Sequence, residues 1–499
     1  MRRFAALNGA MLGAVALAGC TVGPNYTPPA AAVPPAFVGP QAGVQAAGQA
    51  DVTHWWRAFA DPQLDRLVER ALKDSPDIAI AAARVRQART QEIAARAQGL
   101  PQVNASANAT RVEFSKNAGF SSLARLFGGS SGGGSSGGSG SSSGIALPGS
   151  GITTYAVGFD ASWELDLFGG VRRQVQGAVA RTEAAEWNRR DAATMIAAEV
   201  AQAYFAMRFD QQQTAIIQSE LQRQRGALRI AGNVAKVGLV PPIDVTRQRG
   251  SITSTEARLL PIAADMAVRR HALAILLGLE PAALDAELAA PAAAPIAALP
   301  VIPAGLPSDL LRRRPDVRAA ERNLAAATAD IGVAVADLYP RFSLTGMAQL
   351  ISTALGNLFS GDSLQLTGTG AAQFPLIDFG RRRATVKARE AARDEAYLEY
   401  RQTVLQALRD VEDALVQLDA ERQRHVVLMR AVADADASVR ATTAQYRTGF
   451  VAQDAVLNTE AQSLSAREQV AMSEAQLRQQ TIALAKALGG GWEDVTPAR

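Results

Sequence analysis

The longest regular pattern in the chain lies between Gly380 and Gly449, where 68 consecutive residues (381–448) contain neither glycine nor proline. Apolar side chains recur there at spacings of three and four, which predicts one apolar stripe along one face of a helix. The stripe consists of Tyr397, Tyr400, Val404, Leu408, Val411, Leu415 and Leu418. A helix of this length would measure roughly 100 Å, about three times the hydrocarbon core of a bilayer. The pattern therefore predicts an extended helix that packs against partner helices and reaches well beyond a membrane.

A second stretch of the same kind occupies Val171–Val237, and the two stretches belong to an internal duplication. Gly169 and Gly380, which precede them, are 211 residues apart, and the glycines that follow them have the same spacing. Further upstream, Pro101 and Pro340 are 239 residues apart within matching surroundings. Such self-similarity indicates that each half of the chain repeats one supersecondary unit.

Between the helical stretches the period of the pattern changes from 3.6 to 2. This alternation predicts four strands, at 102–114, 152–167, 341–350 and 363–376. In the second strand the apolar residues share one face, and the acids Asp160, Glu164 and Asp166 share the other. Strands with one apolar and one polar face suit a pore wall between lipid and water, so these three acids are predicted to line a pore. The alternative is a soluble, half-buried sheet that caps a helical bundle.

Four strands cannot close a barrel within one chain. An open sheet in lipid would leave unpaired backbone groups along two edges, at several kcal/mol each. Membrane barrels begin at about eight strands, so closure requires a dimer, a trimer with 12 strands or a tetramer with 16. The periodicity alone does not choose among these assemblies.

The remaining patterns divide the chain into a leader, an arm, two repeats and a tail. The expected segments are a signal peptide at 1–19, an N-terminal arm at 20–60, the first repeat at 61–280, a Pro/Ala linker at 281–306, the second repeat at 307–488 and a tail at 489–499. The expected helices after the strand pairs are 170–237 and 241–278, then 381–448 and 453–488. A Gly/Ser run, Gly128–Gly144, accounts for the extra length of the first repeat and is predicted to be a mobile loop.

The first residues have the features of a secretory leader: Arg2 and Arg3, an apolar run of about 16 residues, and the ending Leu17-Ala-Gly-Cys20. This ending resembles the lipobox of bacterial lipoproteins, in which the cysteine is acylated and becomes the mature N-terminus. The resemblance implies that Cys20, the single cysteine of the chain, anchors it to lipid. Thr21, in place of an aspartate, implies sorting to the outer membrane. The alternative is a small residue that lies by chance beside an ordinary cleavage site.

Composition and charge exclude several classes of protein. The residues are 48% hydrophobic but only 5% aromatic, which is typical of extended helices. The formal charge of +4 falls to +2 once the two leader arginines are removed, so nothing favours nucleic acid. The three histidines, at 54, 271 and 425, lack the spacing of a catalytic triad or a metal site. We expect no enzyme activity, no metal and no cofactor. The paired acids Glu412-Asp413 and Asp434/Asp436 are interpreted as solvated helix faces.

The complete arrangement resembles the outer-membrane factor lipoproteins of tripartite, RND-type efflux systems, the TolC-like and NodT-like family. The resemblance covers essentially the whole mature chain. It rests on the duplicated order, the lipobox, the junctions Asp166-Leu-Phe-Gly169 and Asp378-Phe-Gly380, and the turns Gly238-Leu-Val and Tyr446-Arg-Thr-Gly-Phe450. It implies an α+β membrane protein that forms a homotrimer. In this assembly a 12-stranded β-barrel in the outer membrane continues into a long antiparallel α-helical barrel, a 12-helix tunnel through the periplasm.

The same resemblance implies functional residues at the two helix-to-helix turns. These turns would form a periplasmic tip that docks an adaptor protein through Gly238, Leu239, Val240, Gly449, Phe450 and Val451. An acidic gate residue falls at Asp244 and its tyrosine partner at Tyr446. Some family members have an arginine at the position of Val451 and acids at those of Ala455 and Asn458. This chain lacks those charges, so Arg447 is a candidate for the cation of the gate and Asp454 for its acid. The alternative is a constriction that is partly apolar. The alternatives are a favourable helix N-terminal charge for Asp244 and interhelix packing for Tyr446.

Three functions follow. The first is a passive outer-membrane channel that exports drugs or other small toxic compounds delivered by a periplasmic adaptor and an inner-membrane RND-type transporter. The second keeps the channel but passes protein from a type I secretion system. The third is a lipid-anchored helical adhesin or scaffold without a pore. The acids on the strands favour a channel, because a scaffold has no need of a polar lumen.

Overall fold

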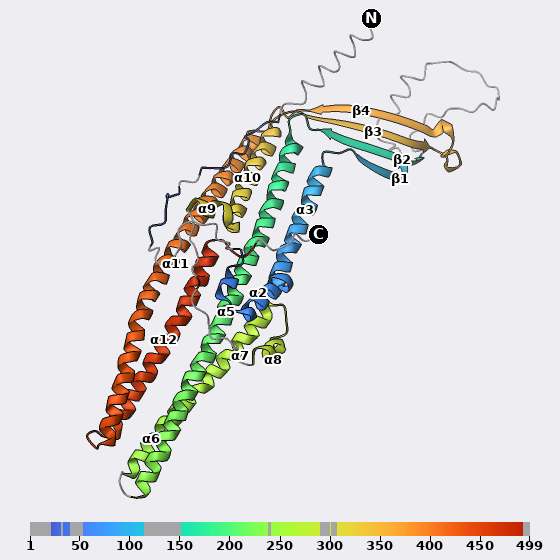
Figure 1. Cartoon of the computed structure of the whole chain (residues 1–499). Helices are drawn as coiled ribbons and strands as arrows, with labels where there is room; N and C mark the ends of the chain where they lie inside the picture. Colours follow the sequence, from blue (N-terminus) through green and yellow to red (C-terminus); the bar gives the residue numbers. More distant parts are fainter. Residues whose placement is uncertain are drawn as a thin grey trace, which may run out of the picture. The chain divides into compact units, whose positions relative to one another are not determined.

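The computed structural model describes residues 21–30, 33–39, 53–113, 151–237, 241–289, 300 and 307–492 (Figure 1). The chain consists of two units. The strand unit comprises Met1–Asn25, Glu92–Gln176 and Thr328–Glu390, and the helical unit comprises Tyr26–Gln91, Gly177–Ala327 and Ala391–Arg499. Cys20 and the Gly/Ser run Gly128–Gly144 lie outside the described residues.

The helices and strands alternate along the chain in two similar series. Those of the first series are α2 (Pro62–Asp74), α3 (Pro76–Ala97), β1 (Gln102–Glu113), β2 (Gly151–Leu165), α5 (Gly170–Lys236), α6 (Pro242–Ala257), α7 (Leu259–Leu276) and α8 (Asp285–Leu288). Those of the second are α9 (Pro307–Arg313), α10 (Pro315–Ala336), β3 (Arg341–Ser352), β4 (Leu364–Gln373), α11 (Arg381–Arg447) and α12 (Gln453–Ala487). None of the described helices has a stretch both long enough and apolar enough to cross a membrane.

Glycine and proline positions explain where the helices begin and end. The two long helices, α5 and α11, have 67 residues each and end within one residue of their expected limits. The helix expected at 241–278 is in fact two, α6 and α7, which meet at Arg258. Pro261 explains the break, because it has no N–H to donate and its ring clashes with the carbonyl group four residues earlier.

The strand unit contains one four-stranded antiparallel sheet in the order β1-β2-β3-β4. The register places apolar residues opposite one another, as in the row Ala105, Phe159, Ala348 and Leu366. The adjacent row on the other face is Asn104, Asp160, Met347 and Thr367. The pairing therefore divides the sheet into a mainly apolar face and a mainly polar face, as the alternation predicts.

Asp166 is an exception to the sequence prediction, because β2 ends at Leu165 and Asp166 is no strand residue. Its carboxylate accepts hydrogen bonds from the backbone N–H groups of Val171 (3.1 Å) and Arg172 (2.9 Å) in the first turn of α5. These N–H groups have no partner within the helix, so a carboxylate there stabilises the helix start. Apolar residues keep alternating at Leu165 and Leu167, so the pattern predicted a strand that runs two residues beyond the end of β2.

The main core of the helical unit is built around Trp55, Trp56 and Phe59 from a short 3₁₀ helix (Trp55–Phe59). Phe59 packs on Phe205 of α5, with 4.8 Å between ring centroids. Trp55, Trp56 and Phe59 thus belong to the core, although the sequence pattern assigned them to an N-terminal arm. The linker expected at 281–306 is likewise ordered where it begins, because Leu284 and Leu288 (α8) are buried in the same cluster.

Residues 26–30 and 33–39 of the arm contact helices of the helical unit. The Tyr26 hydroxyl donates to Glu321 of α10 (2.9 Å), and the backbone N–H groups of Val38 and Gly39 donate to the carboxylate of Glu412 (2.8 and 2.7 Å). Glu412 therefore holds the arm on α11 and is not merely part of a solvated face. Phe37 is buried in the main core.

Candidate functional site

The turn between α11 and α12 is closed by its backbone. Gly449 has a φ of 77°, its N–H donates to the carbonyl of Tyr446 (3.0 Å), and the N–H of Phe450 donates to the carbonyl of Gln445 (3.0 Å). This pair of hydrogen bonds is the Schellman ending of a helix, which requires the left-handed conformation that glycine adopts without strain. It leaves the Phe450 side chain 84% exposed at the end of the hairpin. Val451 is half-buried beside it.

A cluster of charged residues lies next to this turn, between α6 and α12. Arg247 places its Nη1 atom 3.0 Å from Asp454 Oδ1 and 3.8 Å from Asp244 Oδ1. Burial raises the pKa of Tyr446, and the negative charge of Asp244 raises it further, so the phenol stays protonated at neutral pH. Arg447 is exposed. The cation that joins the two acids is thus Arg247, where the sequence pattern suggested Arg447.

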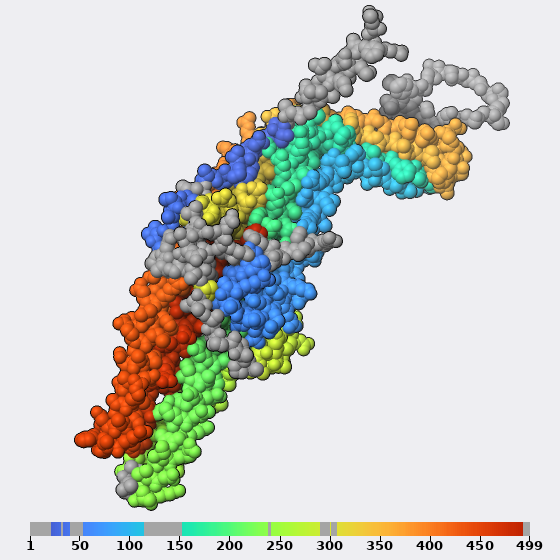
Figure 2. All heavy atoms as spheres, in the orientation of Figure 1, coloured from blue at the N-terminus to red at the C-terminus, as the bar shows by residue number. Residues whose placement is uncertain are grey.

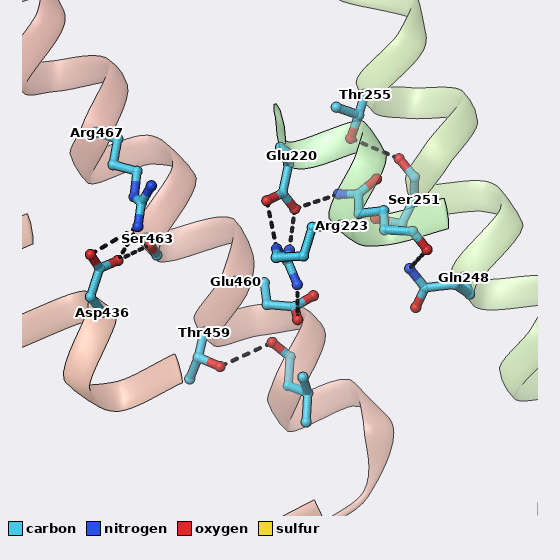
Figure 3. Close-up of polar contacts among 12 residues, drawn as sticks. Glu220, Arg223, Gln248, Ser251, Thr255, Asp436, Thr459, Glu460, Ser463 and Arg467 are labelled. Atoms are coloured by element: carbon cyan, nitrogen blue, oxygen red, sulfur yellow. Dashed lines mark hydrogen bonds and ion pairs between the residues drawn. The ribbon is translucent and has the colours of Figure 1, made fainter. Parts of the chain in front are cut away.

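A second ion-pair cluster joins α5 to α12 further from the turn (Figure 3). Arg223 donates to both Glu220 on its own helix (Nε to Oε2, 2.9 Å) and Glu460 on α12. The Glu460 side chain is only 9% exposed, whereas that of Arg223 is 39% exposed. Burial alone would lower the pKa of Arg223, but the hydrogen bonds to the two carboxylates outweigh it and raise the pKa. Arg223 therefore keeps its charge and links the two hairpins.

Asp436 joins α11 to α12 at a similar level (Figure 3). It accepts hydrogen bonds from the hydroxyl of Ser463 (2.6 Å) and from the guanidinium of Arg467 (2.9 Å). The hydroxyl and the guanidinium hold the pKa of Asp436 below its usual range. Asp436 is thus an ionised partner within the second hairpin and not an ordinary solvated acid.

Three buried amides add further contacts between the hairpins. Gln453 of α12 donates to the side chain of Gln248 of α6 (3.1 Å), which donates to the carbonyl of Gln224 of α5 (3.3 Å). A groove of about 490 Å³ runs beside these contacts between α5, α11 and α12, where the green helices face the orange and red ones in Figure 2.

The acids of the sheet are placed differently. Asp160 lies in the polar row and accepts a hydrogen bond from Asn104 (3.1 Å). Glu164, also on β2, has its Oε1 atom 3.9 Å from the Nε atom of Arg341 of β3. Both remain on the polar face of the sheet, whereas Asp166 stabilises the start of α5. Gly238, Leu239 and Val240 lie outside the described residues. Among the residues that are described, no group of histidines or acids is arranged to hold a metal ion.

Arg247, Arg223 and Glu460 could not be singled out from the sequence pattern. Two of them carried a local signal, because Asp244 and Arg247, like Glu220 and Arg223, are three residues apart on one helix. The contacts to α12 carried none, since Arg223 and Glu460 are 237 residues apart in the chain. On a helix surface, a charge that pairs with a distant helix has the same sequence pattern as a solvated one.

Comparison with known proteins identifies the family. The model of the family described as outer membrane efflux protein matches residues 67–279 and 306–490. The pyoverdine export outer membrane protein OpmQ of Pseudomonas putida is 31% identical over 447 residues, which cover 89% of each chain. The outer membrane protein OprJ of Pseudomonas aeruginosa is 30% identical over 488 residues, covering 97% of this chain and 96% of OprJ.

Solved structures agree with the sequence comparison. The outer-membrane channel OprN superimposes with a TM-score of 0.83 at 31% identity, covering 95% of this chain and 100% of that one. A long helical hairpin in each repeat, a small antiparallel sheet and matches over nearly the whole length leave no support for a scaffold without a pore. The chain belongs to the outer membrane efflux protein family, and it is the non-enzymatic outer-membrane channel of a tripartite efflux pump.

Proposed function

We propose that three copies of this chain form a passive conduit for drugs or other small toxic compounds. The sheets of the three copies combine into a 12-stranded barrel in the outer membrane, and their helices form a tunnel in the periplasm. The division of the sheet into an apolar and a polar face supports this proposal, since a barrel wall needs one face for lipid and one for water. Three sets of four strands exceed the minimum of about eight for a membrane barrel.

Acylated Cys20 anchors each copy to the outer membrane in this proposal. The residues that follow it support this role, because they are fixed beside the sheet. The N–H of Val22 donates to the carbonyl of Phe168 (3.1 Å) in the segment between β2 and α5. A lipid chain attached two residues earlier would therefore have its anchor near the strands that meet the membrane.

The observation that carries the proposal is the set of polar contacts between the two hairpins, which would hold the periplasmic end closed. The pair Arg247–Asp454 is about half exposed on both sides, so it contributes only about 0–1 kcal/mol. The pair Arg223–Glu460 is the stronger restraint, because removing Arg223 would leave a buried carboxylate without its cation. Asp244 and Tyr446 add a weaker restraint at the turn. The summed free energy of these restraints is small enough for a docking protein to overcome.

A periplasmic adaptor docks on the ends of the hairpins and connects the channel to an inner-membrane RND-type transporter. The proposed docking surface consists of Gly238, Leu239, Val240, Gly449, Phe450 and Val451. The exposure of Phe450 supports this role, because an aromatic side chain 84% exposed at a hairpin end is an effective anchor for a partner.

Site-specific photo-crosslinking in living cells tests the partner. A photoreactive amino acid in place of Phe450 is expected to capture a periplasmic adaptor of a proton-driven pump. The matched control is Phe359, which is 77% exposed between β3 and β4 and should capture no periplasmic adaptor. Capture of a secretion-system adaptor at position 450 would redirect the proposal to protein export. Capture of no periplasmic protein by a chain correctly located in the outer membrane would contradict the docking surface.

A further inference from the structure

The two junctions where a strand leads into a long helix are built alike. Gly169 and Gly380, 211 residues apart, both adopt a positive φ, 80° and 87°. As Asp166 does for α5, Asp378 caps α11, because its carboxylate accepts hydrogen bonds from the N–H groups of Gly380 (3.0 Å) and Arg382 (3.2 Å). The offset of 211 residues therefore assigns each residue at the start of α5 a counterpart on α11.

Among the described residues, the N-terminal arm covers the first junction only. A Cβ atom on Gly169 would lie 2.7 Å from Thr21, whereas one on Gly380 would meet nothing within 4 Å. Arg173, which makes three hydrogen bonds to the arm, has Ala384 as its counterpart, and alanine has no side-chain donor. The second junction is therefore open to an occupant that is not part of the described chain.

The start of α11 is strongly basic. Residues 381–389 contain five cations and no acid, whereas the first nine residues of α5, 170–178, contain two arginines. The five cations are Arg381, Arg382, Arg383, Lys387 and Arg389. Cations are unfavourable at the beginning of a helix, where the dipole is positive, and like charges four residues apart repel. Arg382 contacts Asp378 and the carbonyl of Asp337, but no described carboxylate pairs with the other four cations, which are all exposed. An anion from outside the chain would offset this unfavourable charge.

A cavity shows which side of the long helices adjoins the polar face of the sheet. Its volume is about 570 Å³, and it is bordered by Glu164 of the polar face and by the start of α5. The residues of α5 that line it are Gly170, Val171 and Gln174. Their counterparts on α11 are Arg381, Arg382 and Thr385. Because successive residues of a helix are about 100° apart, Arg389 falls on this polar side of α11, whereas Arg383 and Lys387 fall on the opposite side.

The apolar alternation of β4 ends at Leu376, seven residues before Arg383. The strand itself ends at Gln373, and Phe374 and Leu376 continue its apolar side, 53% and 84% exposed. Trp163 of β2 lies on the same apolar face and is 38% exposed. In membrane barrels, aromatic residues at the end of an apolar band mark the border between lipid and water. A cation just beyond that border is at the level of the lipid headgroups.

We propose that Arg383 and Lys387 bind the phosphate group of an anionic phospholipid in the leaflet that faces the periplasm. The inference rests on the proposed function in one respect, that the apolar face of the sheet lies in the outer membrane. Arg383 and Lys387 are four residues apart on one helix, so their Cβ atoms are about 5–6 Å apart and one phosphate can contact both. A guanidinium donates two parallel hydrogen bonds to phosphate oxygens, and the lysine adds a second positive charge. Clusters of such cations next to a membrane segment attract anionic lipids.

Native mass spectrometry with added lipid tests the site. The full-length protein in detergent is titrated with phosphatidylglycerol, which is anionic, or with phosphatidylethanolamine of the same acyl chains, which has no net charge. The test variant is Arg383→Gln/Lys387→Gln. The matched control is Arg381→Gln/Arg389→Gln, which removes the same charge from the polar side of the same helix. Lys387→Arg keeps the charge and should bind like the parent. Circular dichroism verifies the helix content of each variant.

We expect the parent to bind phosphatidylglycerol at least about tenfold more tightly than phosphatidylethanolamine, and the test variant to lose this preference while the control keeps it. Equal affinity of the parent for the two lipids would overturn the proposal. An equal loss in both double variants would show a diffuse attraction and overturn the assignment to Arg383 and Lys387.

Lys387→Gln, which changes one exposed side chain, is the second variant in case the double variant does not fold. An unchanged lipid preference in Lys387→Gln would contradict the site. The same spectra give the number of chains in each particle. An absence of trimers, with the lipid preference retained, would contradict the proposed trimer and leave the lipid site in place.

Discussion

Asp191 of α5 is an acid in surroundings that disfavour its charge. Burial raises its pKa to about 6; Asp316 raises it as well, while Arg314 and Lys486 oppose the shift. Its pKa in the unfolded chain is lower, at the ordinary value of 3.8, so its charge destabilises the fold above pH 6, and this penalty disappears as the pH falls toward 4. The variant Asp191→Asn is expected to be more stable than the parent at pH 7.5, by about 1–2 kcal/mol after allowance for solvent screening.

Thermal unfolding in detergent, followed by circular dichroism between pH 4 and pH 8, measures this difference. The control is Asp413→Asn, which changes an acid 62% exposed that lines the same pocket as Asp191 and should have little effect at any pH. A stability difference that does not vary with pH would contradict the assignment of the effect to Asp191.

Single residues also show what the sequence can and cannot predict. The pattern identified Asp160 and Glu164 as residues of the polar face because strand alternation has a fixed period. It interpreted Glu412 and Asp436 as solvated acids, yet Glu412 holds the arm and Asp436 binds Ser463 on α12. Those partners depend on the packing of distant segments, and neither the period nor the spacing along one helix contains that information.

At the scale of elements, the first residues of the arm are held by one arginine. Arg173 of α5 donates to the carbonyl groups of Val22 and Gly23 (both 3.1 Å) and to the side chain of Asn25 (2.8 Å). Its replacement in Arg173→Ala removes three hydrogen bonds from a charged donor, each contributing about 1.5–3 kcal/mol. Residues 21–25 should then detach, while Tyr26, Phe37 and the helices keep their positions.

Limited proteolysis with mass spectrometry of the fragments measures the detachment. Cleavage within residues 21–30 is expected to be about tenfold faster in Arg173→Ala than in the parent, with unchanged helix content by circular dichroism. The control is Arg229→Ala on the same helix, where the arginine is exposed. Equal cleavage rates in all three proteins would show that Arg173 does not hold the arm.

The extent of the long helices was predictable from sequence, and the extent of the arm was not. A run such as 381–448 without glycine or proline, bounded by Gly380 and Gly449, sets both ends of a helix because these glycines adopt positive φ. Trp55 and Phe59 follow a Pro/Ala/Gly-rich segment that has no period, so only the packing of their side chains in the core shows that the arm ends before them.

At the scale of the whole molecule, each repeat contributes one helical hairpin, and ion pairs and buried amides join the hairpins. Arg223 and Arg247 join the hairpins, whereas Arg225 pairs with Glu256 within the first hairpin alone. Arg223 and Arg247 are therefore expected to restrain opening, and Arg225 is not. Family membership shows that the chain is a channel, and under the proposed function these bridges would hold its periplasmic end closed.

Single-channel conductance in planar lipid bilayers tests this central claim most directly. The variant Arg223→Gln/Arg247→Gln should have an open probability at least about tenfold higher than the parent, which corresponds to about 1.4 kcal/mol. Arg225→Gln should behave like the parent. A double variant that conducts no more than the parent, while still assembled in the bilayer, would contradict closure by these bridges.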